Sequence, residues 1–588
     1  KVIIVCSTTG NGDPPSNAEK FWRFIKKRAH PSTLLKHVQY TVLGLGDTNY
    51  DKFCHMGKSI YRRLKDLGAE SFYDLGCADE AMGLEDAVEP WIEGFWKTFD
   101  IPTSGQVLEP VKTTEVLDQA MQKVAITPLS TELATLPFLA SFESIIQETK
   151  EAEAGRLPRL HEPSFNVSLL APKHEITKTV VEVATDAMYN ATTPFLSSLT
   201  SARYLTTSLS KDRTVLALEL DISSSGIEYV PGDVVGINCP NDEAIVDYLL
   251  QRLQVNEFAL HRVEIEAKKK VTGMPFPLES TLRDIFLYHL DLVALPKKAT
   301  LRALASYCTN AIEKTRLNWL SSKDGGNDFR AFIDAQYLSI VEILALFPSC
   351  QPPLNHVLSL FPRLSPRYYS IASSPLTSPS SVSIAFTVVE YTYGNIPRKG
   401  LCSTWLNALA KPLLEKSGKP TAKVPIFLKP ATDFILPSDA SLPLVLIGPG
   451  TGVAPFMGFL EHRAAQTTGG PIHLFFGCRS RTQDYLFQFE LEKYHAKGTL
   501  TSLFTAFSRD QAEKHYVTHE LIKNGALVYA SLVNGHVYVC GDGMLMAKDV
   551  QEALVTIFVD HGDITREEAE NHLKQLGRDG RYVRDIWC

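Results

Sequence analysis

Three glycines stand in the segment LVLIGPGTGVAPF, between an apolar run and a helical pattern. Gly448, Gly450 and Gly452 therefore occupy a predicted strand-to-helix turn, where backbone N–H groups can approach a pyrophosphate at the helix N-terminus. Their spacing differs from the G-x-G-x-x-G fingerprint of dinucleotide-binding folds. Taken alone, the segment is compatible with a nucleotide site and with an ordinary tight turn.

Two later predicted strands end on residues that could contact the same nucleotide. LFTAFSRD ends with Ser508 and Arg509, and a guanidinium at a strand end can pair with the 2′-phosphate that separates NADP from NAD. Lys514 and Tyr516 follow, and they could add charge and ring stacking. HVYVCGD places Cys540 at the carboxyl end of another strand. Taken singly, Arg509 would ordinarily be interpreted as a surface arginine and Cys540 as a buried structural cysteine.

A second group of candidate residues lies in the middle of the chain. The string RYYSIASSP brings together Arg367, Tyr369 and Ser370, which offer a cation for a pyrophosphate, a flat ring and a hydroxyl donor. In RKGLCSTWL, Gly400–Ser403 opens a predicted helix, whose N-terminus could receive another anion. Each string alone could be a turn between barrel strands. Because the two occur together and a nucleotide-type domain follows them, they indicate a cofactor site more specifically than either does alone.

The elements that must position these residues follow two patterns. Over residues 438–588, the apolar strands LPLVLIGPGTG, HLFFGCR, LTSLFTAFS and HVYVCGD alternate with helices. Residues 1–99 alternate in the same way, with strands predicted at KVIIVC, YTVLGLGD and SFYDLG and helices at AEKFWRFIKKR, KSIYRRLKDLG and VEPWIEGFWKTF. Both stretches predict a doubly wound parallel sheet with right-handed crossovers.

The region between them has a different character. Residues 100–162 are rich in Thr, Ser, Pro, Glu and Lys, which indicates a hinge or linker. Residues 163–437 have the pattern of barrel strands, interrupted at about 241–350 by a helical insertion. The prediction is therefore an α/β multidomain protein with an intervening β domain.

The composition of the chain argues against several classes of protein. With 44% hydrophobic and 21% charged residues, the chain is typical of a globular protein, and its formal net charge of −7 argues against nucleic-acid binding. Ten cysteines are scattered without a CxxC pair, which argues against structural zinc and favours a reducing, cytoplasmic compartment. No apolar run reaches about 18 residues, so we expect no membrane-spanning segment.

Together, the motifs resemble those of a known family. RYYS, GLCS, GPGTG, FFGCR, FSRD, VCGD and the terminal DIW resemble the ferredoxin-reductase-like half of the diflavin reductases. STTGNGDPP and LGLGDTNYDKF resemble the flavodoxin half of that family. The resemblance covers nearly the whole chain. It implies a flavodoxin-like FMN-binding domain over 1–99, an FAD-binding antiparallel β-barrel with a helical connecting insertion over 163–437, and a ferredoxin-reductase-type NADPH-binding domain over 438–588.

Family roles can be carried over to the matching residues around FAD. Arg367 would bind the pyrophosphate, Tyr369 would stack on the isoalloxazine, and Trp587 would cover its other face and swing aside for nicotinamide. Ser370, Cys540, Asp585 and Trp587 would form the hydride-transfer group. The implied FAD contacts are Arg367, Tyr368, Tyr369, Ser370, Gly400, Leu401, Cys402, Ser403 and Trp587.

The resemblance also implies NADPH and FMN contacts. The NADPH contacts are Arg213, Gly450, Thr451, Ser508, Arg509, Lys514, Tyr516, Val517, Thr518 and Asp549. The FMN contacts are Ser7, Thr8, Thr9, Gly10, Asn11, Gly12, Leu43, Gly44, Leu45, Gly46, Asn49, Tyr50, Phe53, Cys54 and Asp79. Thr518 stands where the family often has Gln, Cys588 where Ser is usual, and Thr9 where several relatives have an aromatic residue. We therefore expect Tyr50 or Phe53 to stack on FMN.

Finer features indicate the electron acceptor. ADEAMGLEDAVEPWIEGFW, ALPKKATLRALASY, DFRAFIDAQ, FPSCQPPL and DIWC are most similar to the family members that serve cobalamin-dependent methionine synthase. That resemblance implies electron flow from NADPH through FAD and FMN to this partner, for reductive methylation of cob(II)alamin with S-adenosylmethionine. Two alternatives stay open: a diflavin reductase for a haem or iron–sulfur protein, and a docking module with an FMN-less flavodoxin remnant. The acidic stretch 74–93 is either a partner-docking surface or a solvated helix face.

The opening segment of the chain, KVIIVCSTTGNGDPP, resembles the third strand of a flavodoxin fold. We would then expect roughly fifty residues before it, which would include the first strand of that fold and the loop that binds the FMN phosphate. Val2 to Val5 would present an uncovered apolar edge, and this chain would keep FAD and NADPH chemistry but bind FMN poorly.

Overall fold

The computed structural model divides into two compact units. One unit contains Lys1–Lys173 and Glu243–Leu364, and the other contains His174–Asp242 and Ser365–Cys588. The described residues are 1–8, 14–27, 30–46, 52–79, 84–97, 157–158, 160, 163, 165–171, 189–210, 213–267, 276–277, 280–393, 396–418, 423–466 and 469–587. The predicted linker at 100–162 lies almost entirely outside them, as does Cys588. The predicted domain boundaries therefore stay predictions.

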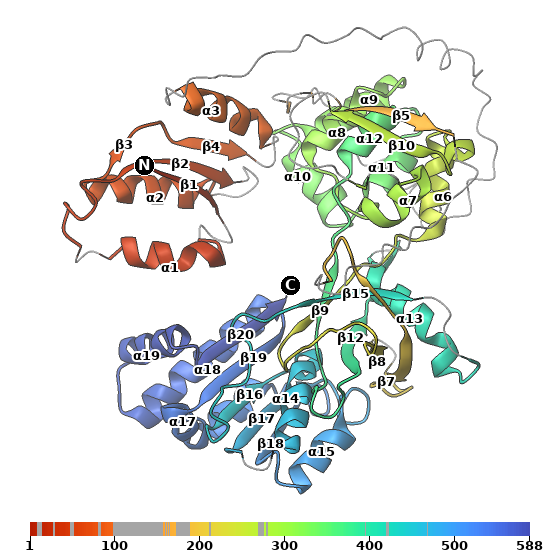
Figure 1. Cartoon of the computed structure of the whole chain (residues 1–588). Coiled ribbons are helices and arrows are strands. Elements are labelled where there is room, and N and C mark those ends of the chain that lie inside the picture. Colours follow the sequence, from red (N-terminus) through yellow and green to blue (C-terminus); the bar gives the residue numbers. More distant parts are fainter. Residues whose placement is uncertain are drawn as a thin grey trace. The chain divides into compact units, whose positions relative to one another are not determined.

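The N-terminal part of the first unit contains a parallel sheet covered by helices (Figure 1). Its elements are β1 (Val2–Ser7), α1 (Ser16–Ile25), β2 (Gln39–Gly46), α2 (His55–Asp66), β3 (Glu70–Ser71), β4 (Gly76–Asp79) and α3 (Glu85–Lys97). β2 pairs in parallel with β1, β3 and β4. Tyr40 and Val42 of β2 are fully buried, and they pack with Ile60 and Leu64 of α2. This arrangement agrees with the alternation of strands and helices in the sequence.

One predicted strand in this sheet is wrong. SFYDLG was expected to form a single strand, but β3 ends at Ser71 and β4 begins only at Gly76. Between β3 and β4, side chains hydrogen-bond to the backbone carbonyls: the Ser71 hydroxyl donates to Tyr73 O at 2.7 Å, and the Trp91 indole donates to Asp74 O at 2.8 Å. The chain therefore turns where the apolar pattern predicted extended structure.

The prediction of an apolar edge at β1 is confirmed. Within the described residues, β1 pairs only with β2. Val2, Ile3 and Val5 are 44%, 50% and 58% exposed. Exposed β-branched side chains on an edge strand form a hydrophobic surface.

A mostly helical region makes up the rest of the first unit. It contains α6 (Glu243–Arg252), η3 (Asn256–Phe258), α7 (Leu282–Asp284), η4 (Ile285–His289), α8 (Lys298–Ala305), α9 (Ala311–Ser321), α10 (Gly326–Phe329), η5 (Arg330–Asp334), α11 (Ile340–Leu346) and α12 (Leu354–Leu360). Two strands, β5 (Phe165–Leu170) and β10 (Arg262–Ala267), pair antiparallel beside these helices.

Two sequence-based expectations about this region need correction. Residues 165–170 were predicted to belong to the barrel, but β5 pairs along its whole length with β10, which lies between the helices. The helices also continue past residue 350, to Leu360 of α12. Alternating apolar residues indicate that a segment is a strand, but not which distant strand pairs with it.

A buried arginine holds one turn of this region. Arg252, at the end of α6, is 4% exposed. Its guanidinium donates to the carbonyl oxygens of Leu344, Phe347, Pro348 and Cys350 at 3.2, 3.3, 3.0 and 2.7 Å. Arg252 thereby satisfies four carbonyl groups, one within α11 and three in the turn that follows it.

We expect Arg252→Ala to lower the free energy of unfolding of this region by about 3 kcal/mol, because it leaves several buried carbonyls without donors. Limited proteolysis and thermal melting of the full chain would measure the loss. Arg330→Ala is a matched control, because Arg330 is exposed and hydrogen-bonds to Gly326 O and Asn327 Oδ1 in its own turn, and should cost less than about 1 kcal/mol. Equal effects of the two variants would contradict this role of Arg252.

The second unit begins with antiparallel β structure. One sheet has the order β11-β9-β15-β6 and a second has the order β12-β8-β7. The strands and helix are β6 (Phe195–Ser197), β7 (Leu199–Tyr204), β8 (Thr214–Asp221), β9 (Val234–Ile237), β11 (Arg367–Ser370), β12 (Ser381–Val388), β13 (Glu390–Tyr393), β14 (Ile396–Lys399), α13 (Leu401–Leu414) and β15 (Val424–Lys429). Inward-facing side chains of both sheets form one core with Leu406 and Ala410 of α13.

A five-stranded parallel sheet completes the second unit, with the order β18-β17-β16-β19-β20. Its elements are β16 (Leu444–Ile447), η6 (Gly450–Val453), α14 (Ala454–Ala465), β17 (Ile472–Cys478), α15 (Gln488–Ala496), β18 (Ser502–Phe507), α16 (Val517–Lys523), α17 (Gly525–Asn534), β19 (His536–Asp542), α18 (Met544–Gly562), α19 (Arg566–Arg578) and β20 (Tyr582–Trp587).

Helices cover both faces of this sheet (Figure 1). Phe456 and Phe459 of α14 pack against one face, while α16–α19 pack against the other. Every residue of β16 and β17 is buried, as expected for strands covered on both sides. No helix in the described part of the chain is both long and apolar enough to cross a bilayer.

Candidate active site

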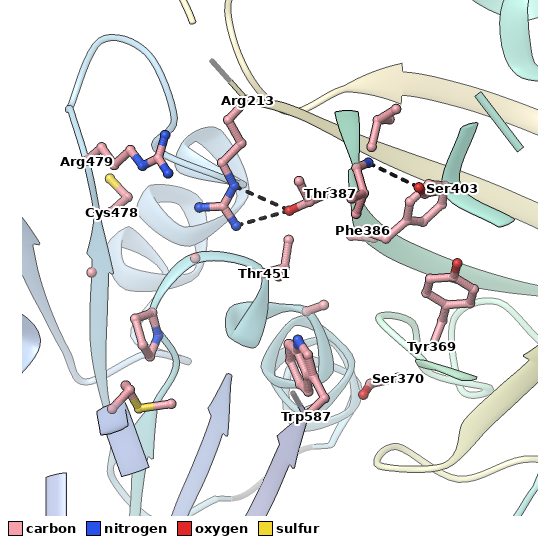
Figure 2. A pocket seen from close by; sticks show the side chains of 18 of the residues that line it. Arg213, Tyr369, Ser370, Phe386, Thr387, Ser403, Thr451, Cys478, Arg479 and Trp587 are labelled. Atoms are coloured by element: carbon pink, nitrogen blue, oxygen red, sulfur yellow. Dashed lines mark hydrogen bonds between the residues drawn. The ribbon is translucent and has the colours of Figure 1, made fainter. Parts of the chain in front are cut away.

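The second unit contains a cavity of about 950 Å³ between its antiparallel strands and its parallel sheet (Figure 2). All nine residues that the family resemblance assigned to FAD line this cavity. Eight of the ten residues assigned to NADPH also line it: Arg213, Gly450, Thr451, Ser508, Tyr516, Val517, Thr518 and Asp549. Segments far apart in the sequence therefore meet at one site.

The barrel side of the cavity is built on β11. Tyr369 is largely buried, its ring centroid lies 5.1 Å from that of Phe386, and burial raises the pKa of its hydroxyl well above the usual range. The neighbouring Tyr368 points to the other side of the strand, where the Lys429 ammonium lies 4.5 Å from its ring centroid. The phenol of Tyr369 stays neutral, so this wall offers a flat, uncharged ring.

The N-terminus of α13 opens onto the same cavity. Gly400 is its N-cap residue, and no side chain caps the helix. A Cβ atom on Gly400 would lie 2.7 Å from Ser403 Oγ and 2.8 Å from Val389 Cβ, so only glycine fits there. Ser403 Oγ accepts a hydrogen bond from Val389 N at 3.1 Å, which fixes this hydroxyl at the cavity wall. Uncapped N–H groups at the start of a long helix suit a phosphate.

Ser370, Asp585 and Cys540 form a hydrogen-bonded group beside the cavity. The Ser370 hydroxyl donates to Asp585 Oδ2 at 3.1 Å, and the Cys540 thiol lies 3.9 Å from the same oxygen. Cys540 and Asp585 face each other in the parallel register of β19 and β20. Ser370 lines the cavity, whereas Cys540 is fully buried behind it.

Burial controls the protonation of this group. It raises the pKa of the Asp585 carboxyl above its usual range, against the opposing effects of the Ser370 and Cys540 hydrogen bonds and of Lys429. Burial and the Asp585 charge raise the pKa of the Cys540 thiol well above 9, so the thiol is neutral. The arrangement therefore holds one carboxylate between two neutral donors.

Trp587 lies at the same end of the cavity as Ser370 in Figure 2. It is the last residue of β20, opposite Asp542 of β19, and it is only partly buried. The strand pairing fixes its backbone, while its indole borders open volume.

The other end of the cavity is cationic. The Arg213 guanidinium donates to Thr387 Oγ1 from Nε at 3.3 Å and from Nη2 at 3.1 Å. Gly450 has a φ of +58°, and a Cβ there would lie 3.1 Å from the same guanidinium. The Ser508 hydroxyl donates to Cys478 O at 3.3 Å. Tyr516, which precedes α16, is 47% exposed, so its ring remains available to a ligand.

Two predicted NADPH residues, Arg509 and Lys514, do not line the cavity. The structure also places residues there to which the sequence analysis gave no role, among them Phe386, Thr387, Arg479, His515 and Met546. Arg479 was within reach of sequence reasoning, because it closes the FFGCR motif and follows β17. Nothing local in the sequence marks Phe386 or Thr387, which lie in an ordinary alternating strand.

The predicted FMN residues are placed only in part. Ser7 pairs with Leu45 and Gly46 pairs with Asp79, so the carboxyl ends of β1, β2 and β4 meet at one edge of the sheet. The Thr8 hydroxyl accepts a hydrogen bond from Met56 N at 3.1 Å. Described members of this set are Ser7, Thr8, Leu43, Gly44, Leu45, Gly46, Phe53, Cys54 and Asp79. Thr9, Gly10, Asn11, Gly12, Asn49 and Tyr50 lie outside the described residues.

Comparison with known proteins agrees with this architecture. Family models described as flavodoxin, FAD binding domain and oxidoreductase NAD-binding domain match residues 1–91, 187–405 and 446–552. The chain is 36% identical to methionine synthase reductase of Mus musculus and to that of Homo sapiens, over 100% of this chain and 92% of each relative. It is 33% identical to NADPH–cytochrome P450 reductase of Sus scrofa, over 100% of this chain and 80% of that relative. The chain belongs to the diflavin reductase family.

The expected fold class and cofactors of this diflavin reductase are thereby confirmed: it is an oxidoreductase that uses NADPH, FAD and FMN. The cavity fits the first two of these groups, because it combines a flat neutral ring, an uncapped helix N-terminus and a cationic end. When bound, NADPH supplies a hydride and the flavins supply one-electron chemistry.

We expect Arg213→Ala to weaken NADP⁺ binding about tenfold, because the diflavin reductase would lose a charge-assisted hydrogen-bond donor at the cavity. Isothermal titration of the FAD-loaded protein with NADP⁺ would measure the change. Arg203→Ala provides the matched control, because Arg203 pairs with Glu490 at the surface. An unchanged affinity of Arg213→Ala for NADP⁺ would show that Arg213 does not bind the nucleotide.

Proposed function

We propose that this diflavin reductase delivers electrons to cobalamin-dependent methionine synthase. The electrons would support reductive methylation of cob(II)alamin with S-adenosylmethionine as methyl donor. The observation that carries this proposal is the set of relatives named methionine synthase reductase, which are 35–37% identical over 92% of their own length. The relatives that reduce cytochrome are 33% identical over 80% of theirs.

The decisive experiment offers the NADPH-reduced protein three acceptors: cob(II)alamin methionine synthase with S-adenosylmethionine, a microsomal cytochrome and an iron–sulfur protein. We expect loss of cob(II)alamin absorbance and recovery of methionine synthase turnover, faster than reduction of the other acceptors. Preferential reduction of the cytochrome or the iron–sulfur protein would overturn the proposal and leave the family assignment intact.

A haem protein is the second candidate acceptor, favoured by the 33% identity to the cytochrome reductases. Flavin release and quantitation test a different alternative, a docking module without FMN. One FMN and one FAD per chain would support the enzyme, whereas FAD alone would support the docking module.

We propose the acidic stretch 74–93 as the surface that meets the acceptor. It holds seven acidic residues and no lysine or arginine. A surface that carries only negative charges accelerates the encounter with a basic partner, and salt screens that attraction. Partner reduction should therefore slow with rising ionic strength while reduction of FAD by NADPH stays constant, in stopped-flow measurements.

We also propose roles for the residues at the cavity. Arg367, Gly400 and Ser403 would bind the FAD pyrophosphate, and Tyr369 and Trp587 would enclose the flavin ring. Ser370 would orient the reacting groups, with its hydroxyl held by Asp585. The hydrogen bond from Ser370 to Asp585, at 3.1 Å, supports this assignment because it fixes the position of the hydroxyl at the cavity wall.

A further inference from the structure

Cys308 and Cys350 face each other within the helical region of the first unit. Cys308 lies in the turn between α8 and α9, and Cys350 lies in the turn between α11 and α12. The two residues form an isolated antiparallel bridge. Both thiols are free in the structure.

The backbone hydrogen bonds define the type of this bridge. Thr309 N donates to Ser349 O at 3.3 Å, and Gln351 N donates to Tyr307 O at 3.1 Å. These bonds flank Cys308 and Cys350, which are therefore a non-hydrogen-bonded antiparallel pair. Such pairs have Cα atoms about 4.5 Å apart, at the short end of the range of about 4.4–6.8 Å seen in disulfides.

The two side chains point to the same place. The Cys350 thiol donates to Leu304 O at 3.2 Å, and the Cys308 thiol donates to the same oxygen at 3.7 Å. The neighbouring Cys350 thiol lowers the pKa of the Cys308 thiol below its usual value. Two sulfur atoms that share one acceptor can approach bonding distance by side-chain rotation alone.

Several contacts hold the two turns in this position. The Ser349 backbone N–H and hydroxyl both donate to Glu313 Oε2, at 3.0 and 2.7 Å. Arg252 donates to the Cys350 carbonyl at 2.7 Å. The pair is therefore preorganised, so closing it requires little movement of the backbone.

We propose that Cys308 and Cys350 are a redox-active pair that closes reversibly to a disulfide when the protein meets a peroxide. Cys308 is 8% exposed and Cys350 is 1% exposed, so Cys308 is the sulfur that a small oxidant reaches. The Cys308 thiolate attacks one oxygen of hydrogen peroxide, the O–O bond breaks, and that oxygen stays on the sulfur as a sulfenic acid, while the other oxygen leaves as hydroxide and is protonated to water. Cys350 sulfur then attacks Cys308 sulfur and releases a second water. Two thiols are oxidised by two electrons, and one peroxide becomes two waters.

The disulfide would join the turn after α8 to the turn after α11 and close a loop of about 40 residues. That loop contains α9, α10, η5 and α11 (Figure 1). The oxidised region would therefore resist unfolding more strongly than the reduced region, and a dithiol would reverse the change.

Peptide mapping of the full chain tests the proposal. After brief treatment with hydrogen peroxide, trypsin should yield peptide 303–314 crosslinked to peptide 331–363, each of which contains one cysteine. The crosslinked mass should be lower than the sum of the peptides by two hydrogen atoms. Alkylation of both cysteines should fall about tenfold and return with dithiothreitol. The melting temperature of the region should be about 5 °C higher when oxidised.

Cys308→Ser and Cys350→Ser should each abolish both the crosslink and the thermal shift. Cys77→Ser is the matched control and should retain them, because Cys77 lies in β4 of another part of the chain. Sulfinic acid at Cys308 without a crosslink, a crosslink to another cysteine, or two thiols that stay reduced would each overturn the proposal. An equal yield of the crosslink from protein unfolded in urea would do the same.

Discussion

Asp585→Asn is expected to slow the reduction of FAD by NADPH about 100-fold, which corresponds to about 2.7 kcal/mol of lost transition-state stabilisation. The amide keeps the shape of the side chain but removes its charge. Ser370 and Cys540 would then lose the anion to which their hydrogens point, at 3.1 and 3.9 Å. Stopped-flow absorbance of the flavin under anaerobic conditions measures this step directly.

The same residue gives the step a pH dependence. Burial raises the pKa of the Asp585 carboxyl, and we expect its ionised form to be the active one. The rate should therefore fall as the pH drops through this raised pKa, above the usual range of carboxyl groups, and Asp585→Asn should flatten that limb. The folding stability depends on pH in the opposite direction to the rate. Because the folded-state pKa exceeds the unfolded value, the folded state binds the proton more tightly, and stability decreases as the pH rises between the two values.

A surface carboxylate provides the control for Asp585. Asp579 follows α19 and accepts a hydrogen bond from the Gln575 side chain at 2.8 Å. Asp579→Asn should change the rate less than about twofold. The FAD content of both variants should equal that of the parent. A rate within a factor of two in Asp585→Asn would exclude the proposed role of this carboxylate.

Gly452→Ala is expected to disrupt the nucleotide turn, with a loss of about 3 kcal/mol or more in the free energy of unfolding of the parallel-sheet domain. A Cβ on Gly452 would lie 2.0 Å from the Cys540 carbonyl oxygen and 2.9 Å from the Cα of Gly541. Both neighbours are backbone atoms of β19, so neither can rotate away. The turn after β16 would have to move, together with the cavity wall at Gly450 and Thr451.

Thermal melting and NADP⁺ titration of Gly452→Ala measure these two effects. Gly577→Ala is the matched control, because Gly577 lies inside α19 and its nearest neighbour, Tyr582 O, would be 3.9 Å from the new Cβ. Alanine favours a helix over glycine, so this variant should gain about 0.5–1 kcal/mol. If Gly452→Ala melts like Gly577→Ala, the close approach to β19 has no energetic importance.

Much of the fold was predictable because its signals are local. β16 consists of continuous apolar residues that end at a glycine turn, and β17 is apolar apart from His473; such runs are typical of strands buried on both faces. The nucleotide turn at Gly450 and the opening of α13 at Gly400 depend on short strings whose backbone geometry is set by neighbouring residues. The assignment of FAD and NADPH followed from such strings in the second half of the chain, and that of FMN followed from STTGNGDPP and LGLGDTNYDKF.

Other features could not be predicted, because residues that touch in space are remote in the chain. SFYDLG has the composition of a strand, but the indole of Trp91 and the hydroxyl of Ser71 bond the carbonyls of its turn. β5 follows the linker in sequence and yet pairs with β10 among the helices. Thr387 holds Arg213 at the cavity from a strand without any motif.

The sequence by itself determined the family, the order of the domains and most of the residues that line the cavity, because each motif shapes a contiguous strand, turn and helix start. Only the tertiary structure decided how these pieces act on one another. It brought Asp585 to Ser370 across 215 residues, placed Arg252 on four carbonyls of a distant turn, and set Cys308 opposite Cys350. The physical reason is that periodicity records which side of an element is buried, whereas packing alone selects the partner that buries it.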